Sequence, residues 1–330
     1  LSGGVPVWLD YHLEHPAWTG FSAWDLIMPL FLFITGASMP FSFAKLTEGT
    51  PYYRRIYLKL VRRVLLLWVL GMVAQGRLIE SVTALDPSLL RFYSNTLQAI
   101  ASGYLVAALC LLHLPKRAHG AVCAALLLGY WALLTLVPVP GHGAGVLEPD
   151  ANLALHVDEL ILGPFRDGSS YTWILSSMGF AGSVLLGVFA GDILRAPWSN
   201  KKKLGGLIAA GLACLLAGAA WGQFFPIIKH IWSSSMVLWA AGWSYLLLAA
   251  FFALMDMAGH KRWAFPFIII GANAILAYMV GEAIVGAITG AAEDTLGDSP
   301  LIQATAATFA FGVMWAGLYG MYKKRWFLRV

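Results

Sequence analysis

The stretch EHPAWTGFSAWDLIMPLFLFITG, residues 14–36, places a histidine and an aspartate at the start of a long apolar segment. His15 precedes Asp25 by ten residues, and Pro29, which would loosen a helix, follows four residues later. Histidine is the side chain best suited to move protons near neutral pH, and a carboxylate can orient its ring. Spacing alone leaves two interpretations open: proton-transfer chemistry, or a solvated histidine beside an aspartate that caps the helix or pairs with a basic residue.

A second histidine competes for the same role. His12 lies three residues before His15, a spacing that resembles two metal ligands on a helix. Pro16 follows immediately, and no third ligand is clustered nearby. We therefore predict no metal site.

Composition indicates a membrane protein. Hydrophobic residues make up 59% of the 330-residue chain and charged residues 12%, with a mean hydropathy of +0.71, whereas soluble domains carry about a quarter charged residues. The net charge of +5 does not indicate nucleic acid, because the basic residues occur in short clusters between apolar runs. Three cysteines, Cys110, Cys123 and Cys214, lie in apolar segments without metal-ligand spacing and are predicted to be buried, reduced thiols.

A hydrocarbon core requires about 20 apolar residues per helix. Nine segments meet this need, so we predict an all-α polytopic bundle with one domain over 1–330. The connection 139–171 is long and rich in Pro, Gly, Asp and Glu. The nine predicted spans are 22–44, 56–75, 94–113, 119–138, 172–194, 204–222, 231–256, 264–288 and 300–322.

The distribution of Lys and Arg predicts the orientation. With a cytoplasmic C-terminus and alternating spans, all basic residues except four fall on the cytoplasmic side. The same assignment places His12, His15, Asp10 and Glu14 outside. The four exceptions are Arg77, Arg91, Arg166 and Lys229.

Ionisable and amide side chains inside spans are costly and mark either function or interhelical hydrogen bonds. Glu282 and Asn273 lie nine residues apart in the eighth span and could share a face, and Gln98 is a similar intramembrane amide. Lys229 and Trp232 sit at a helix entrance, where snorkelling is the simpler explanation.

The segment YYRRIYLKLVRR, 52–63, is basic and aromatic at a predicted cytoplasmic helix start. It either sets topology beside anionic lipid or binds a phosphorylated donor. GVFAG at 187–191 predicts helix packing. GHGAG at 141–145 predicts a turn rather than a phosphate site.

The segment HPAWTGFSAWDLIMPLFLFITGASMPFS resembles the signature of the heparan-α-glucosaminide N-acetyltransferase family and its bacterial relatives. His15, Trp18, Gly20, Asp25 and Pro29 match that signature, as do Leu26, Phe31, Phe33 and Gly36. The resemblance continues through 97–109, 136–149, 224–237, 271–284 and the basic ending YKKRWFLRV.

The resemblance implies transfer of acetyl from cytoplasmic acetyl-CoA to an amino sugar or glycan on the opposite side of the membrane. It implies that His15 is the general base or acetyl carrier, with Asp25 orienting the ring. We expect the acceptor to bind to Trp18, Gln98, Lys229, Trp232, Asn273 and Glu282. We expect the diphosphate of acetyl-CoA to bind to Arg54, Arg55, Arg62 and Arg63. No metal cofactor is expected.

The chain departs from the family at its start. The family has one more span, which would make ten, and its site asparagine falls at Ser2 or is absent here. We keep two other hypotheses: an N-acetylglucosamine-type transporter, supported by Glu282 and Asn273, and an inactive scaffold. The expected location is a bacterial inner membrane with lipid around the bundle, and the resemblance makes a homodimer an expectation.

Overall fold

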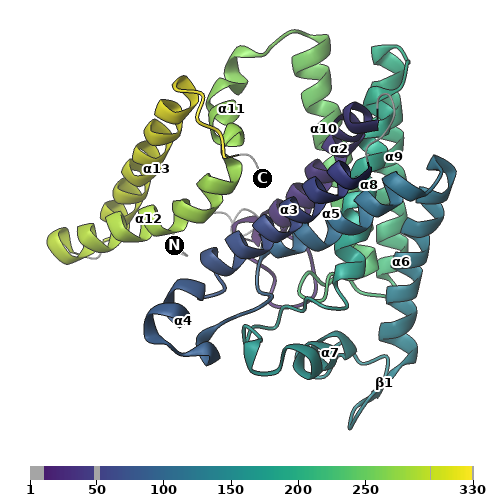
Figure 1. Cartoon of the computed structure of the whole chain (residues 1–330), viewed down its shortest axis with the longest axis horizontal. Coiled ribbons are helices and arrows are strands. Elements are labelled where there is room, and N and C mark those ends of the chain that lie inside the picture. Colours follow the sequence, from purple (N-terminus) through teal and green to yellow (C-terminus); the bar gives the residue numbers. More distant parts are fainter. Residues whose placement is uncertain (1–10, 48–52, 298, 329–330) are drawn as a thin grey trace. The chain divides into compact units, whose positions relative to one another are not determined.

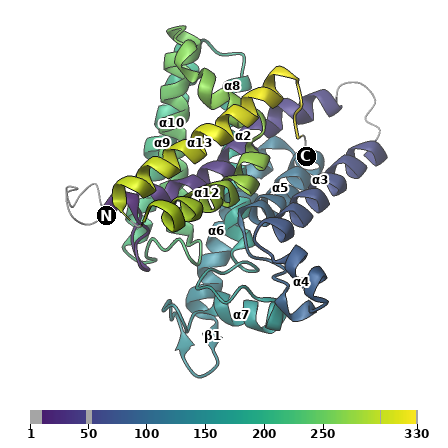
Figure 2. The same cartoon turned by 90° about the vertical axis from the view of Figure 1, so that its left-hand side faces the viewer.

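The computed structural model describes residues 11–47, 53–297 and 299–328, and it is almost entirely helical (Figures 1 and 2). Asp10 and Ser2, named above, lie outside the described residues. The long elements are the α-helices α2 (Ile27–Thr47), α3 (Tyr53–Ala74), α5 (Thr96–His113), α6 (Lys116–Leu136), α8 (Ser177–Arg195), α9 (Asn200–Gly222), α10 (Ser234–Phe251), α12 (Ala274–Leu296) and α13 (Pro300–Lys323).

Shorter elements fill the connections. They are η1 (Trp24–Leu26), α4 (Leu78–Ala84), η2 (Pro87–Leu89), β1 (Pro138–Val139), β2 (Gly143–Ala144), α7 (Leu153–Leu162), η3 (Gly163–Phe165), the π-helical η4 (Phe252–Met257), η5 (Arg262–Ala264) and α11 (Phe265–Ala272). The predicted connection 139–171 therefore contains a hairpin and a helix. The predicted turn at 141–145 is confirmed, because it closes the antiparallel β1–β2 pair with Gly141, Gly143 and Gly145 at positive φ.

The chain divides into two compact units. The main unit comprises 6–253, and the second comprises 254–330 together with 1–5, which lie outside the described residues. Within the second unit, α12 packs along α13, and α11 also packs on α13. The prediction of one domain over 1–330 stays a prediction.

Eight helices in the described part of the chain are long and apolar enough to cross a membrane, which makes this an integral membrane protein. Eight of the nine predicted spans correspond to these helices. The exception is α3, whose first half contains Arg54, Arg55, Lys59, Arg62 and Arg63. This helix nevertheless packs along α5 and returns the chain to the end of the bundle where α2 begins.

The predicted span 264–288 is wrong in its bounds, since the helix breaks at Asn273 into α11 and α12. Asn273 has φ −132° and ψ 42°, outside the helical region. Its side chain accepts a hydrogen bond from Leu328 N at 2.8 Å and donates one to Trp326 O at 3.0 Å. Those bonds tie the break to the C-terminal segment, a long-range contact that periodicity cannot report.

Helix α8 lies at the centre of the main unit and packs against α2, α5, α6 and α10. Glycines allow the close approach of α2 and α8. A Cβ on Gly36 would lie 1.9 Å from Val184 O, and one on Gly187 would lie 2.0 Å from Phe33 O. Gly191 faces Ala37 O in the same way. The helix-packing role predicted for residues 187–191 is confirmed.

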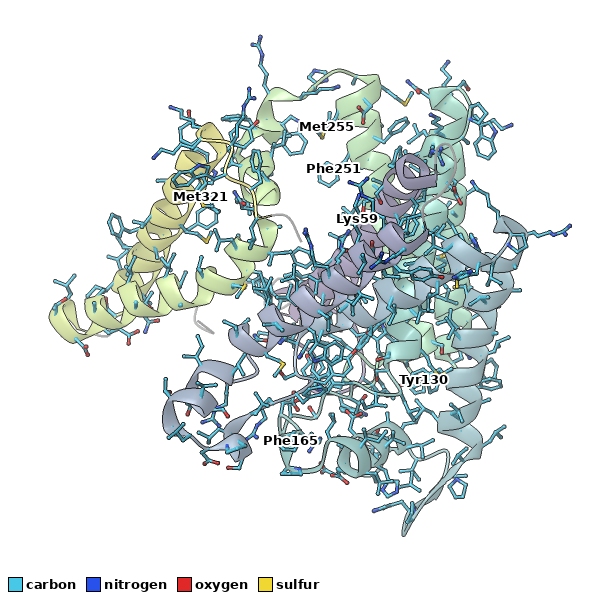
Figure 3. The ribbon with its side chains drawn as sticks, viewed as in Figure 1. Lys59, Tyr130, Phe165, Phe251, Met255 and Met321 are labelled. Carbon is cyan, nitrogen blue, oxygen red and sulfur yellow. The ribbon has the colours of Figure 1, made fainter. Side chains whose placement is uncertain are left out.

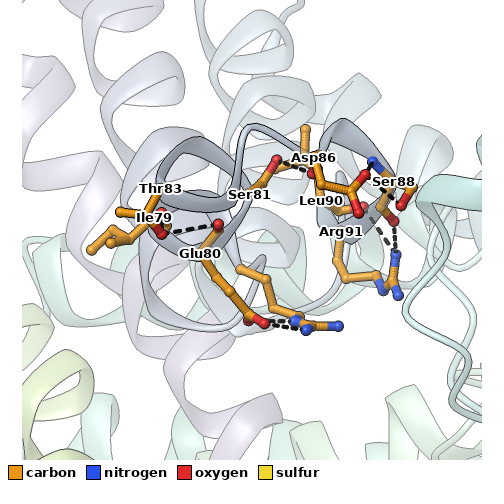
Figure 4. Close-up of polar contacts among 9 residues, drawn as sticks. Ile79, Glu80, Ser81, Thr83, Asp86, Ser88, Leu90 and Arg91 are labelled. Atoms are coloured by element: carbon orange, nitrogen blue, oxygen red, sulfur yellow. Dashed lines mark hydrogen bonds and ion pairs between the residues drawn. The ribbon is translucent and has the colours of Figure 1, made fainter.

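One end of the main unit is covered by α4, α7 and the β1–β2 hairpin (Figure 1). The segment after α3 is held by local polar contacts: Arg77 pairs with Glu80, and Asp86 accepts from Ser88 N at 2.9 Å (Figure 4). Arg91 donates to Pro164 O at 3.2 Å, which joins this segment to η3. We call this the site end, because His15 and Asp25 also lie there.

Candidate active site

The structure brings His15 and Asp25 into direct contact. His15 Nδ1 lies 2.6 Å from Asp25 Oδ1. The Asp25 side chain is 2% exposed and that of His15 42%. A carboxylate only accepts hydrogen bonds, so Nδ1 must donate its proton to Asp25. In the neutral ring, Nε2 then carries the lone pair and is free to accept a proton or attack a carbonyl.

Lys229 completes the cluster from a distant part of the chain. Its Nζ lies 3.1 Å from the same oxygen, Asp25 Oδ1, and 3.4 Å from His15 Nδ1. The Lys229 side chain is only 10% exposed, so it does not snorkel to solvent. Burial lowers the pKa of Lys229, and the Asp25 carboxylate opposes this by raising it.

The orientation of Asp25 follows from a local sequence pattern. Asp25 Oδ2 accepts from Ser22 N at 2.9 Å, while Asp25 N donates to Ser22 Oγ at 3.3 Å. This reciprocal pair has the form of a capping box, although Ser22 lies one residue before Ala23, the N-cap of η1. The cap thus uses one carboxylate oxygen and leaves the other for His15 and Lys229, so Asp25 is both a cap and a partner of a basic residue.

Backbone pairing places Lys229 beside the histidine segment. Thr19 forms an antiparallel bridge with Ile228, and Gly20 N donates to Ile227 O at 2.9 Å. Ile228 also belongs to a buried cluster with Tyr130, Leu134, Val139, Leu153, Ala154, Phe225 and Ile231. Tyr130, labelled in Figure 3, donates to Ile231 O. The 223–233 loop is therefore fixed by the core.

Aromatic side chains pack next to Lys229. Trp18 Nε1 donates to Leu147 O at 2.8 Å, and its ring meets His230 edge-on at 5.1 Å between centroids. His230 stacks on Tyr171 at 4.3 Å. Burial, followed by the Lys229 charge, lowers the pKa of His230, and burial raises the pKa of Tyr171 to about 12. Both groups are therefore uncharged near neutral pH.

The other predicted acceptor residues lie in different settings. Trp232 is buried with its Nε1 donating to Ser183 Oγ at 3.1 Å. Gln98 is buried at the start of α5, donating to Phe92 O at 2.7 Å and accepting from Ser94 N at 2.8 Å. Asn273 belongs to the second unit, as described above. Glu282 lies in α12, and its side chain is outside what the structure describes. Their substrate roles stay predictions.

The predicted donor residues occupy the first half of α3. Arg54, Arg55 and Arg62 are exposed, while Arg63 is partly buried with its guanidinium 4.3 Å from the centre of the Tyr104 ring. Arg63 Nε has no hydrogen-bond partner among the described residues. Lys59, in the same half of α3, lies well away from Phe165 at the site end (Figure 3).

Sequence reasoning missed the roles of Ser22, Tyr171 and Asp158. The pattern Ser-x-x-Asp at 22–25 was a readable capping signal. Tyr171 carries no such signal. Asp158 is fully buried and accepts from Trp173 N at 2.7 Å and Ile174 N at 2.8 Å.

The three cysteines form no disulfide among the described residues. Cys110 and Cys123 are free and buried, and Cys214 is free and partly buried.

Fold and site together define an integral membrane protein with a buried carboxylate shared by a histidine and a lysine. No protein-family model matches the chain. It is 26% identical to heparan-alpha-glucosaminide N-acetyltransferase from Homo sapiens, over 85% of this chain and 50% of that protein. It is 25% identical to the protein of the same name from Mus musculus, over 99% of this chain and 57% of that protein.

The chain is thus a distant relative of the heparan-alpha-glucosaminide N-acetyltransferases, as the residues of the opening segment predicted. It spans about half the length of the curated relatives that it matches.

Proposed function

We propose that this protein is a membrane acetyltransferase that moves acetyl from acetyl-CoA to the amine of an amino sugar or glycan. The observation that carries the proposal is the 2.6 Å contact between His15 Nδ1 and Asp25 Oδ1, which leaves Nε2 as a basic nitrogen on a partly exposed ring. The distant relationship to N-acetyltransferases supports the reaction class.

His15 has one of two roles in this proposal. As general base, Nε2 accepts the amine proton while the amine nitrogen attacks the thioester carbonyl; a C–N bond forms, the C–S bond breaks, and the proton passes to the CoA sulfur. As acetyl carrier, Nε2 itself attacks the carbonyl, and the C–S bond breaks to release the CoA thiolate; the amine then takes the acetyl group, the N–acetyl bond to the ring breaks, and the amine proton goes to the freed Nε2. Asp25 orients the ring and stabilises its positive charge on either route.

The exposed arginines of α3 suit the donor. Arg54, Arg55 and Arg62 offer guanidinium groups, which pair well with phosphate oxygens, and Arg63 offers an Nε that has no hydrogen-bond partner in the described part of the chain. We propose that they hold the diphosphate of acetyl-CoA. Because α3 runs from this basic half toward the site end, donor and acceptor would approach from opposite ends of the bundle.

The topology belongs to the same proposal. The basic residues favour a cytoplasmic C-terminus, with His15 on the extracytoplasmic side, and we propose a bacterial inner membrane as the location. Lys229, which contacts His15, and Trp18, whose ring meets the neighbouring His230, are the residues best placed to contact the acceptor. The homodimer also stays a proposal.

The transporter hypothesis has less support. It depended on Asn273 and Glu282, and the Asn273 amide is already bonded to the backbone at Trp326 and Leu328. The contacts of His15 and Lys229 with Asp25 support the acyl-transfer hypothesis instead.

The test is transfer of labelled acetyl from acetyl-CoA to glucosamine by the protein in detergent or nanodiscs. We expect transfer by the wild type and none by His15→Ala, with CoA binding retained. His142→Ala is the matched control, since His142 is an exposed histidine of the β1–β2 hairpin. Equal transfer by wild type and His15→Ala would exclude His15 as base and carrier. If the wild type neither transfers acetyl nor binds CoA, the transporter hypothesis would be favoured.

A further inference from the structure

One oxygen of Asp25 serves two basic groups. Oδ1 lies 2.6 Å from His15 Nδ1 and 3.1 Å from Lys229 Nζ, whereas Oδ2 accepts from Ser22 N. The carboxylate is almost completely buried. A buried carboxylate needs a nearby positive charge, and only one of its two basic neighbours has to supply it.

We propose that Lys229 is a positioning residue that neutralises Asp25 and thereby keeps His15 uncharged and able to accept a proton. The inference rests on the proposed function, in which the neutral imidazole is the reactive form. If Lys229 were absent, the Asp25 charge would be balanced by protonating His15, because an adjacent carboxylate favours imidazolium. The ring would then hold the proton that the reaction requires it to accept.

The charged and titratable groups around His15 support this assignment. His12 and Glu14 lie on its own segment and are exposed. Asp25 and Lys229 contact it, and His230 and Tyr171 lie behind Lys229. His230 and Tyr171 are neutral near pH 7 for the reasons given above. Lys229 is thus the cation in contact with both Asp25 and His15 among the described residues.

The position of Lys229 is fixed, which a counter-ion requires. The bridge between Thr19 and Ile228 holds the preceding residue, and Trp232 N donates to Lys229 O at 3.0 Å. The ammonium also lies 5.8 Å from the centre of the Tyr171 ring. A cation held against an aromatic face beside a carboxylate stays charged although burial disfavours it.

The test measures the protonation of His15 without relying on acetyl transfer. Diethylpyrocarbonate modifies histidine in its neutral form and not as imidazolium, so the rate of His15 modification against pH, followed by peptide mass spectrometry, reports the neutral fraction. We expect the midpoint of this curve to move up by about 1 to 2 pH units in Lys229→Met. Lys229→Arg, which keeps the charge, should restore the wild-type midpoint.

Lys116→Met is the matched control. Lys116 Nζ also pairs with a carboxylate, Asp192 Oδ1 at 2.8 Å, but its ion pair joins the start of α6 to the end of α8, away from the site end. This variant should leave the His15 curve unchanged. Lys229→Gln, which keeps a donor for Asp25, provides a second neutral variant if Lys229→Met does not fold.

An unchanged midpoint in a folded neutral variant would overturn the proposal. So would a shift in Lys229→Arg equal to that in Lys229→Met, because charge would then not be the cause. In the transfer assay, the neutral variants should lose about 10-fold or more at pH 6.5, and the loss relative to wild type should be smaller at pH 9. A midpoint shift without any acetyl transfer by the wild type would refute the proposed function and leave this inference standing.

Discussion

Trp232 Nε1 donates a 3.1 Å hydrogen bond to Ser183 Oγ in the buried middle of α8. Trp232 has φ 51°, a left-handed conformation that is unusual for a large side chain. It lies three residues after Lys229, and a Cβ on Gly179 would come within 2.7 Å of its ring. This contact anchors the 223–233 loop, which carries Lys229, to α8, the most buried of the described spans.

Ser183→Ala should weaken that anchor. The variant leaves a buried indole N–H without an acceptor, which costs about 1–3 kcal/mol. We expect a lower thermal unfolding midpoint in detergent. Ser38→Ala is the control, because the Ser38 hydroxyl is exposed and bonds only to its own helix at Thr35 O. Equal midpoints for Ser183→Ala and wild type would show that the bond contributes nothing to stability.

Gly36→Ala should disrupt the packing of α2 on α8. The new methyl group would lie 1.9 Å from Val184 O, and a backbone carbonyl cannot rotate away as a side chain would. Overpacking of this kind costs about 1–3 kcal/mol or more. Because α2 directly follows η1, which contains Asp25, the acetyl-transfer rate should fall as well. Gly205→Ala in α9 meets no atom within 4 Å and should keep both stability and rate.

Local sequence signals predicted elements that depend on nearby residues, whereas elements fixed by contacts between distant residues escaped prediction. The apolar runs predicted eight of the spans, since hydrocarbon thickness sets helix length directly. The break at Asn273 escaped prediction, because it depends on Trp326 and Leu328, more than fifty residues away. Likewise, His15 and Asp25 shared a readable motif, whereas Lys229 is brought to them by long-range backbone pairing of Thr19 and Gly20 with Ile228 and Ile227.

Asp158 should make stability depend on pH. Burial raises its pKa to about 6, although the N–H groups of Trp173 and Ile174 lower it in part. The folded state therefore holds a proton that the unfolded chain, with a carboxyl pKa near 3.9, has released. Stability should fall as pH rises from about 4 to about 6, by at most about 1.4 kcal/mol per pH unit, and then level off.

The measurement is the thermal unfolding midpoint at several pH values between 4 and 7. Asp158→Asn should flatten the fall between pH 4 and 6, because the titrating group is gone. Asp150→Asn is the control, since Asp150 is an exposed carboxylate of the same connection. Identical slopes for wild type and Asp158→Asn would contradict the assignment.

The basic half of α3 should bind the donor. Arg55→Gln combined with Arg62→Gln removes two exposed guanidinium groups, and we expect CoA affinity to fall about tenfold or more, since hydrogen bonds to charged groups contribute about 1.5–3 kcal/mol. Titration calorimetry with CoA measures this. Lys201→Gln, an exposed cation at the start of α9, should not change CoA affinity. Unaltered CoA binding in the double variant would exclude this donor site.

Asp25→Asn should abolish most of the transfer without changing the size of the side chain. Three donors surround the carboxylate: Ser22 N at Oδ2, and His15 Nδ1 and Lys229 Nζ at Oδ1. An amide has only one acceptor oxygen. If that oxygen keeps Ser22, the amide nitrogen faces His15 and Lys229, and Nδ1 must change from donor to acceptor.

The imidazole proton would then move to Nε2, so the ring would lose its basic nitrogen where the acceptor amine approaches. We expect the transfer rate to fall about 10²-fold or more, the contribution typical of a positioned base, with CoA binding unchanged. Asp192→Asn is the matched control, because Asp192 pairs with Lys116 away from the site end. A folded Asp25→Asn protein that transfers acetyl within threefold of the wild-type rate would show that Asp25 does not set the tautomer of His15.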